Sequence, residues 1–164
     1  MAGSILFSGN AFSVADGKGR FVLPLDMRKL IRQASEDKNT LVTSIDEARG
    51  CVVGFGTSHK RELEDGIVEK MRAALTRGDD YDADAEREKL FGPMDDVNFD
   101  DGGRFFLPQD IKDEYGIGDV VFFVGASQRI QLWSPEGYLA SEGRPELMKN
   151  KVRRFLAERE AAGK

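Results

Sequence analysis

Short apolar runs alternate with turn-forming segments along most of the chain. Residues 21–23 and 105–107 are strand-favouring runs, each preceded by a glycine-containing loop and followed by a proline. Proline has a preset φ and no N–H, so it suits the first turn of a helix. We therefore expect helices at about residues 25–34 and 109–115, the second of which ends at Gly116, because glycine readily adopts the left-handed cap conformation.

Two further strand-like runs follow each predicted helix. In the first half they are residues 40–44 and 51–55, and in the second half residues 120–124 and 130–133. Both pairs are joined by glycine-bearing segments and are typical of hairpins. Each half therefore has the order strand, loop, strand, helix, hairpin. A unit of about fifty residues buries little apolar surface and is marginal alone, so we expect the two halves to pack together or to interleave with other subunits.

Helical spacing marks two other segments. Between the halves, residues 58–90 carry an apolar stripe at intervals of four, formed by Leu63, Ile67, Met71 and Leu75. The acidic stretch 79–88 within this connector is expected to be partly mobile. Near the end of the chain, residues 145–162 are expected to form a helix whose apolar positions are Leu147, Val152, Phe155 and Leu156.

The chain also contains an internal repeat, a feature that constrains the whole fold. When the sequence is shifted by 84 positions, residues 16–28 (DGKGRFVLPLDMR) align with residues 100–112 (DDGGRFFLPQDIK). Seven of these thirteen positions are identical. Each copy begins with the pattern D-x-x-x-R and continues into an apolar run and a proline, which makes chance a poor explanation.

Charge is strongly segregated along the chain. The net charge of the whole chain is −5, yet residues 78–101 carry −8, residues 1–34 carry +3 and residues 144–164 carry +4. Partners respond to the local field of a surface more than to the total charge. The acidic total therefore does not exclude nucleic acid.

Several other classes of protein are disfavoured. One cysteine, Cys51, cannot form an internal disulfide, and with the lone His59 it cannot complete a metal site. Cys51 is expected to be buried packing. The pair Gly54 and Gly56 lacks the third glycine of a phosphate-binding fingerprint. The opening MAGSILFSGNAF has no secretory pattern, and no run reaches the roughly 20 apolar residues that span a bilayer. We expect no enzyme activity, cofactor, metal or small-molecule substrate.

The paired D-x-x-x-R loops, each followed by an apolar run and a proline, resemble the MraZ family, a two-copy branch of the AbrB-like proteins. The likeness extends over residues 7–139 and includes the segments 51–55 (CVVGF), 124–125 (VG) and 132–133 (LW). It implies an α+β, mostly β fold in which two swapped-hairpin repeats form one pseudo-symmetric unit of double-barrel type. The corresponding divisions are a first repeat at 7–56, a helical acidic connector at 57–91, a second repeat at 92–140 and a basic C-terminal helix at 141–164.

The resemblance also implies a function. Proteins of this family assemble into closed rings of about eight to twelve subunits. They bind direct repeats in the promoter of the division and cell-wall gene cluster, which contains their own gene. A cytoplasmic, nucleoid-associated repressor that binds double-stranded DNA, without a membrane, is therefore expected. The resemblance carries over Lys18, Arg20 and Arg104 as candidate DNA contacts. Arg28, on the first helix, is a further candidate, for which a place on a solvated helix face is the alternative.

A structural role competes with this function at the loops. Asp16 could pair with Arg20, and Asp100 with Arg104, merely to fix a turn, and carboxylates repel phosphate. We expect the two aspartates, with Gly19 and Gly103, to shape the loops and the arginines to contact DNA. The second loop has glycine in place of Lys18, so the first copy should dominate binding. An AbrB-type antitoxin-like protein and an acidic ring scaffold that recruits proteins without DNA remain the alternatives.

Overall fold

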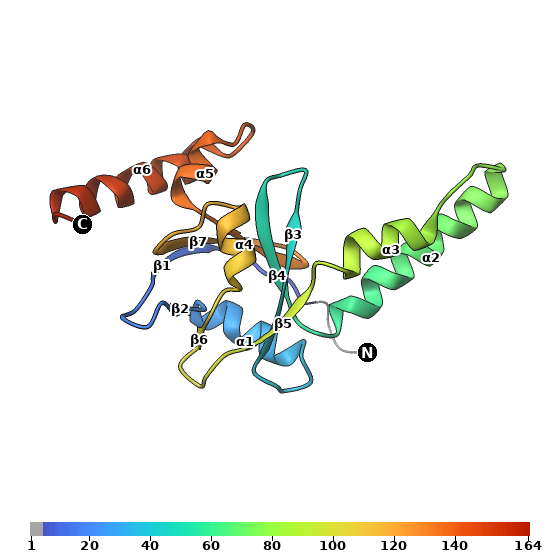
Figure 1. Ribbon diagram of the computed structural model, residues 1–164, viewed down its shortest axis with the longest axis horizontal. Coiled ribbons are helices and arrows are strands. Elements are labelled where there is room, and N and C mark those ends of the chain that lie inside the picture. The colour runs from blue at the N-terminus through green and yellow to red at the C-terminus, as the bar shows by residue number, and fades with distance from the viewer. Residues whose placement is uncertain (1–4) are drawn as a thin grey trace.

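The computed structural model describes residues 5–164, so the first four residues of the opening segment lie outside it. The fold is α+β, with an antiparallel six-stranded sheet, a separate two-stranded ribbon and six helices (Figure 1). The elements are β1 (Asn10–Val14), β2 (Phe21–Val22), α1 (Leu25–Gln33), β3 (Thr40–Asp46), β4 (Cys51–Phe55), α2 (His59–Arg77), α3 (Ala83–Phe91), β5 (Asp95–Asn98), β6 (Arg104–Phe105), α4 (Gln109–Glu114), β7 (Val120–Ala126), β8 (Arg129–Trp133), α5 (Pro135–Ala140) and α6 (Glu146–Ala161).

The local predictions for both repeats are confirmed. Pro24 and Pro108 directly precede α1 and α4 with φ of −54° and −52°, the values that proline imposes. Gly116 follows α4 at a positive φ of 64°. The two predicted hairpins are present, because β3 pairs with β4 and β7 pairs with β8.

Strand pairing shows that the two repeats exchange strands. The sheet order is β1-β7-β8-β4-β3-β5. The first strand of copy one, β1, pairs with the hairpin strand β7 of copy two, and the first strand of copy two, β5, pairs with β3 of copy one. β4 and β8 join the two hairpins, and β2 pairs with β6. The expected pseudo-symmetric unit of swapped hairpins is therefore confirmed.

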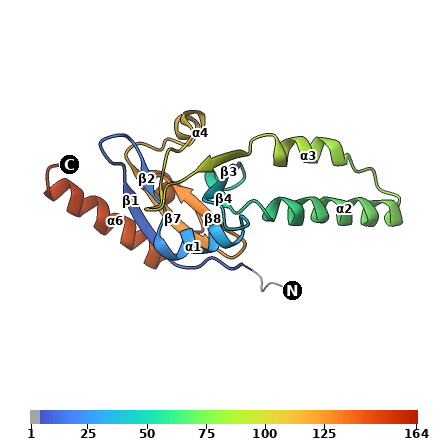
Figure 2. The same ribbon diagram turned by 90° about the horizontal axis from the view of Figure 1, so that it is seen from below.

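Apolar side chains pack on both faces of the six-stranded sheet. The larger cluster lies between the sheet and the layer formed by β2, β6, α1 and α4, and includes Phe21, Phe105 and Phe123. The second cluster lies on the other face and includes Cys51, Trp133 and Tyr138, with Val152 from α6. Figure 2 shows the sheet between α6 and the α2–α3 hairpin, which extend in opposite directions.

The connector differs from the sequence prediction. Residues 58–90 form two helices, and α3 folds back along α2 (Figures 1 and 2). Leu75 does not continue the apolar stripe: it is 79% exposed, and Ala74 is buried in its place. Residues 83–88 of the acidic stretch lie in α3, and the carboxylate of Asp82, the residue before this helix, accepts a hydrogen bond from the N–H of Ala85 at 3.0 Å. The partial mobility of the stretch stays a prediction.

The C-terminal helix begins after Pro145, as predicted, and rests on β1. The rings of Phe12 and Phe155 stack with centroids 4.0 Å apart and an interplanar angle of 3°. Leu147 is an exception to the predicted apolar face: it is 68% exposed, while Met148 packs against the second cluster. The division of the chain into four segments stays a prediction. In the part of the chain described, no helix is long and apolar enough to cross a membrane.

Candidate nucleic-acid interface

The first D-x-x-x-R loop is closed by a carboxylate clamp. Oδ1 of Asp16 accepts hydrogen bonds from the backbone N–H groups of Lys18 and Arg20, both at 2.9 Å. Oδ2 of Asp16 lies 2.9 Å from both Nε and Nη2 of Arg20. The backbone N–H of Asp16 in turn donates to the carbonyl of Arg20 at 2.9 Å. The loop therefore fixes the direction in which the arginine side chain points.

The second loop repeats this arrangement. Oδ1 of Asp100 accepts from the backbone N–H of Arg104 at 2.8 Å, and Oδ2 accepts from its Nε at 2.7 Å. Gly19 and Gly103 occupy equivalent positions, and both have a φ of +84°, a region that side-chain-bearing residues seldom adopt. The local ion pairs considered above are present in both copies. The role of these aspartates and glycines in shaping the loops stays a prediction.

Both aspartates are held in the ionised form. The backbone N–H of Arg20, followed by the Arg20 side chain, lowers the pKa of Asp16 below its ordinary value. The backbone N–H of Arg104 is likewise the main cause that lowers the pKa of Asp100. Each clamp is therefore charged at neutral pH, and each guanidinium keeps a fixed anionic partner.

A clamped arginine retains unused donors. The guanidinium has five N–H groups, and Asp16 engages only the Nε and Nη2 side of Arg20. The Arg20 side chain is 23% exposed and the Arg104 side chain 49% exposed. The free edge of each guanidinium suits a phosphate or the O6/N7 edge of guanine, since both accept two parallel hydrogen bonds.

The remaining candidates lie near the loops in different ways. Lys18 is exposed at the tip of the first loop. Arg28 from the first repeat packs on the second loop, where its Nη1 donates to the carbonyl of Asp101 at 3.4 Å. A Cβ at Gly103 would lie 2.6 Å from that Nη1 atom, so glycine is required there for this contact. Arg28 thus brings a cation to the loop that lacks an equivalent of Lys18.

Sequence reasoning missed a polar network beside the second loop. Asn39 donates to Oδ1 of Asp101 at 3.1 Å and accepts from Arg32 at 2.8 Å. The hydrogen bond from Asn39 holds the carboxylate of Asp101, which has no equivalent in the first loop. No local signal predicts it, because Asn39 and Asp101 are brought together only by the exchange of strands between repeats.

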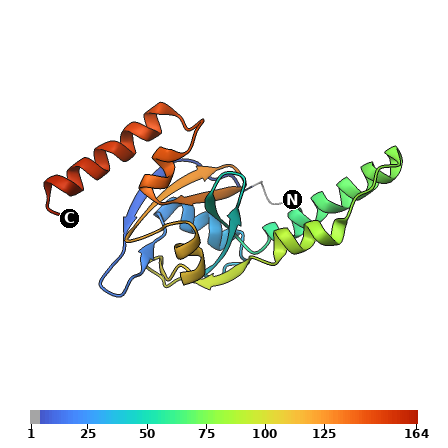
Figure 3. The same cartoon turned by 45° about the horizontal axis from the view of Figure 1, so that its top comes forward.

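The ribbon β2–β6 connects the two loops. Each loop leads directly into one of these strands, and the strands are antiparallel, so the loops lie at opposite ends of the ribbon. Figure 3 shows the β1–β2 loop (blue) projecting from the body of the molecule. Arg20 and Arg104 thus lie at opposite ends of one ribbon, with Lys18 in the loop at the first end and Arg28 of α1 beside the loop at the second.

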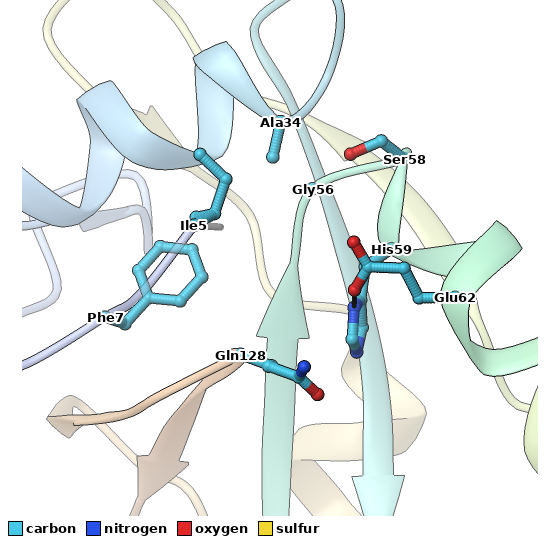
Figure 4. Close-up of a pocket in the computed structure, with 8 residues that line it drawn as sticks. All are labelled: Ile5, Phe7, Ala34, Gly56, Ser58, His59, Glu62 and Gln128. Carbon is cyan, nitrogen blue, oxygen red and sulfur yellow. Dashed lines mark hydrogen bonds and ion pairs between the residues drawn. The ribbon is translucent and has the colours of Figure 1, made fainter. Parts of the chain in front are cut away.

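A separate cavity lies away from the loops. It has a volume of about 240 Å³ and is lined by residues including Ile5, Phe7 and His59. Figure 4 shows His59 and Glu62 pointing toward one another, and Nδ1 of His59 lies 2.7 Å from Oε2 of Glu62. The ring of His59 also packs edge-on against Phe55.

Cys51 of β4 is not part of this cavity: it is buried in the second apolar cluster, and its burial was predicted. Residues 5–164 hold no cluster of three or more potential metal ligands.

The fold and the loops together define a class: a two-repeat, swapped-hairpin protein that presents a carboxylate-clamped arginine from each repeat. The chain belongs to the MraZ family. Residues 90–156 match the family described as "MraZ protein, putative antitoxin-like". A relative from Rickettsia bellii, named transcriptional regulator MraZ, is 30% identical over 131 residues, which cover 77% of this chain and 81% of the relative.

Two further relatives bear the same name. The protein from Rhodospirillum rubrum is 28% identical over 141 residues, which cover 84% of this chain and 85% of that protein. The protein from Nitratidesulfovibrio vulgaris is 28% identical over 129 residues, which cover 79% of this chain and 80% of that protein. The resemblance inferred from the repeated loops is thus confirmed at the level of the family.

Proposed function

We propose that this chain is a DNA-binding transcription regulator that acts without a catalytic step. It binds direct repeats in its own promoter through the two D-x-x-x-R loops of a ring-shaped oligomer and represses its division and cell-wall gene cluster. The observation that carries this proposal is the repeated clamp, in which Asp16 orients Arg20 and Asp100 orients Arg104. In both copies the clamp engages one side of the guanidinium and holds the other side in an orientation that suits a phosphate or a base edge.

Each candidate contact has its own role in this proposal. Arg20 and Arg104 read base edges or grip phosphates, since an oriented guanidinium loses little freedom when it binds. Lys18 acts as a point charge toward the phosphate backbone. Arg28 adds a cation beside the second loop, which offsets the missing lysine there. Several weak loops in one ring bind tightly together because each raises the effective concentration of the next.

The first test is fluorescence-anisotropy binding to the DNA upstream of this protein's own gene, compared with random DNA across a salt series. Arg20→Ala should weaken binding to the specific DNA by about tenfold to a hundredfold, because a bidentate contact is lost. Lys18→Ala should weaken binding to both DNAs alike and lower the salt slope by about one. Both variants should keep the oligomeric state of the wild type.

Arg77→Ala is the matched control for this test. Arg77 also forms an exposed pair with an aspartate, at 2.7 Å from Asp79, but it lies at the end of α2, far along the helical hairpin. It should bind DNA as the wild type does. If the wild type shows no preference for the specific DNA even at low salt, the regulator proposal fails, and a scaffold that uses the acidic connector becomes the leading function.

A further inference from the structure

The outer face of the β2–β6 ribbon carries apolar side chains that packing does not explain. Side chains alternate between the two faces of a strand. Phe21, Leu23, Phe105 and Leu107 point inward and are at most 5% exposed. Val22 and Phe106, at the intervening positions, are 42% and 58% exposed.

The register places these apolar side chains beside the clamped arginines. Val22 lies directly opposite Arg104, and residues opposite each other in an antiparallel pair share a face. One step further along the same register brings Phe106 opposite Arg20. The outer face of the ribbon thus presents two pairs, each made of one arginine and one apolar side chain.

Both repeats build this face in the same way. Val22 and Phe106 are 84 positions apart, which is the spacing of the repeat, and each follows its arginine by two residues. An exposed apolar residue at one position needs no explanation, whereas its recurrence at the equivalent position of a second copy points to a shared role. Both ends of the ribbon therefore present an apolar side chain, but phenylalanine is larger than valine and extends further from the ribbon.

We propose that Val22 and Phe106 contact the 5-methyl groups of thymines that neighbour the bases read by Arg104 and Arg20. This inference rests on the proposed function and adds specificity-determining residues to it. The major groove of B-DNA admits a two-stranded β-ribbon, where arginine pairs with guanine and apolar groups contact the thymine methyl. The operator thus carries thymines next to guanines, with the Phe106 end reaching further into the groove than the Val22 end.

DNA fits this face better than a second copy of the chain does. A contact between copies would bury Arg20 and Arg104 along with the apolar pair, and buried guanidinium groups are costly unless a partner supplies matching anions. Asp16 and Asp100 each engage only one side of their own arginine, so the N–H groups on the other side would need further acceptors from the second copy. DNA supplies anionic phosphates and apolar methyl groups within one groove, which matches both components of the face.

The test removes single methyl groups from the DNA. Each thymine of the DNA upstream of the protein's own gene is replaced in turn by deoxyuridine, which differs only by the 5-methyl group. For the wild type, substitution at a contacted thymine should weaken binding by about three- to fivefold, the effect expected of one buried methyl group. Phe106→Ala should abolish this sensitivity at one set of thymines, and Val22→Ala should abolish it at another.

Leu147→Ala is the control, since Leu147 is also exposed but lies on α6. This variant should keep the full sensitivity to deoxyuridine. Light scattering of every variant should show the oligomer of the wild type. If specific, Arg20-dependent binding survives every deoxyuridine substitution unchanged, the methyl contact is overturned while the proposed function stands. If Val22→Ala or Phe106→Ala dissociates the oligomer and leaves the deoxyuridine sensitivity intact, the face joins copies of the chain and the inference is equally overturned.

Discussion

Cys51 is the one thiol of the chain, and it lies in β4 with its side chain in the second apolar cluster. Burial, followed by the charge of Asp46, raises the pKa of this thiol to about 12. Because the thiolate is the reactive form, the native protein should react negligibly with a thiol reagent at pH 8. The same protein should react fully once it is unfolded in denaturant. Stoichiometric labelling of the native protein within minutes would contradict the burial of Cys51.

At the same scale, sequence reasoning predicts contacts within one loop but not contacts between loops. The spacing of Asp16 and Arg20, four residues apart around a glycine, is enough to anticipate their pairing. The position of Arg28 was not foreseeable in this way. Its partner, the carbonyl of Asp101, lies 73 residues further along the chain and approaches only because the two repeats interleave. Local patterns carry no information about that register.

Replacing glycine by alanine should change the free energy of unfolding in opposite directions at two positions, one inside a helix and one just after a strand. Gly66 lies within α2, and a Cβ there would meet no atom within 4 Å, so Gly66→Ala should stabilise the protein by about 1 kcal/mol. Gly56 follows β4, and a Cβ there would lie 2.7 Å from the backbone carbonyl of Ala34. Gly56→Ala should therefore destabilise the protein by about 1–3 kcal/mol. Chemical denaturation of both variants gives the comparison, and equal midpoints would contradict it.

The helical connector shows why a hydrophobic stripe is an incomplete guide to an element. The spacing of four correctly indicated a helix, and Ile67 is buried as expected. The stripe could not indicate how far along α2 other parts of the chain pack against it. The assignment of Leu75 to the packed face was therefore wrong. The return helix α3 is held by polar contacts instead: Lys70 pairs with Glu86 at 2.6 Å, and Arg87 pairs with Glu64 at 2.6 Å. A charged sequence alone does not distinguish such pairs from a solvated segment.

At the scale of the whole molecule, the repeat and the fold class could be predicted, whereas the exchange of strands followed only from the resemblance to a family. Two copies of a motif are equally compatible with two separate small domains. The pairing of β1 with β7 and of β5 with β3 excludes that arrangement. Each copy completes the sheet of the other, so neither can unfold while the other keeps its full set of hydrogen bonds.

This interleaving predicts that a destabilising substitution in one repeat lowers the stability of the other repeat by the same amount. Leu41 lies in β3 of the first repeat and is fully buried in the larger cluster, so Leu41→Ala should cost about 2–5 kcal/mol. Trp133, the one tryptophan, lies in β8 of the second repeat within the second cluster. Its fluorescence should report the same lowered denaturation midpoint as far-ultraviolet circular dichroism. Leu75→Ala, at an exposed site, should leave the free energy of unfolding obtained from both signals within about 0.5 kcal/mol of the wild type. If Leu41→Ala lowers the dichroism midpoint while the Trp133 transition stays in place, the two repeats unfold independently and the interleaved core does not act as one cooperative unit.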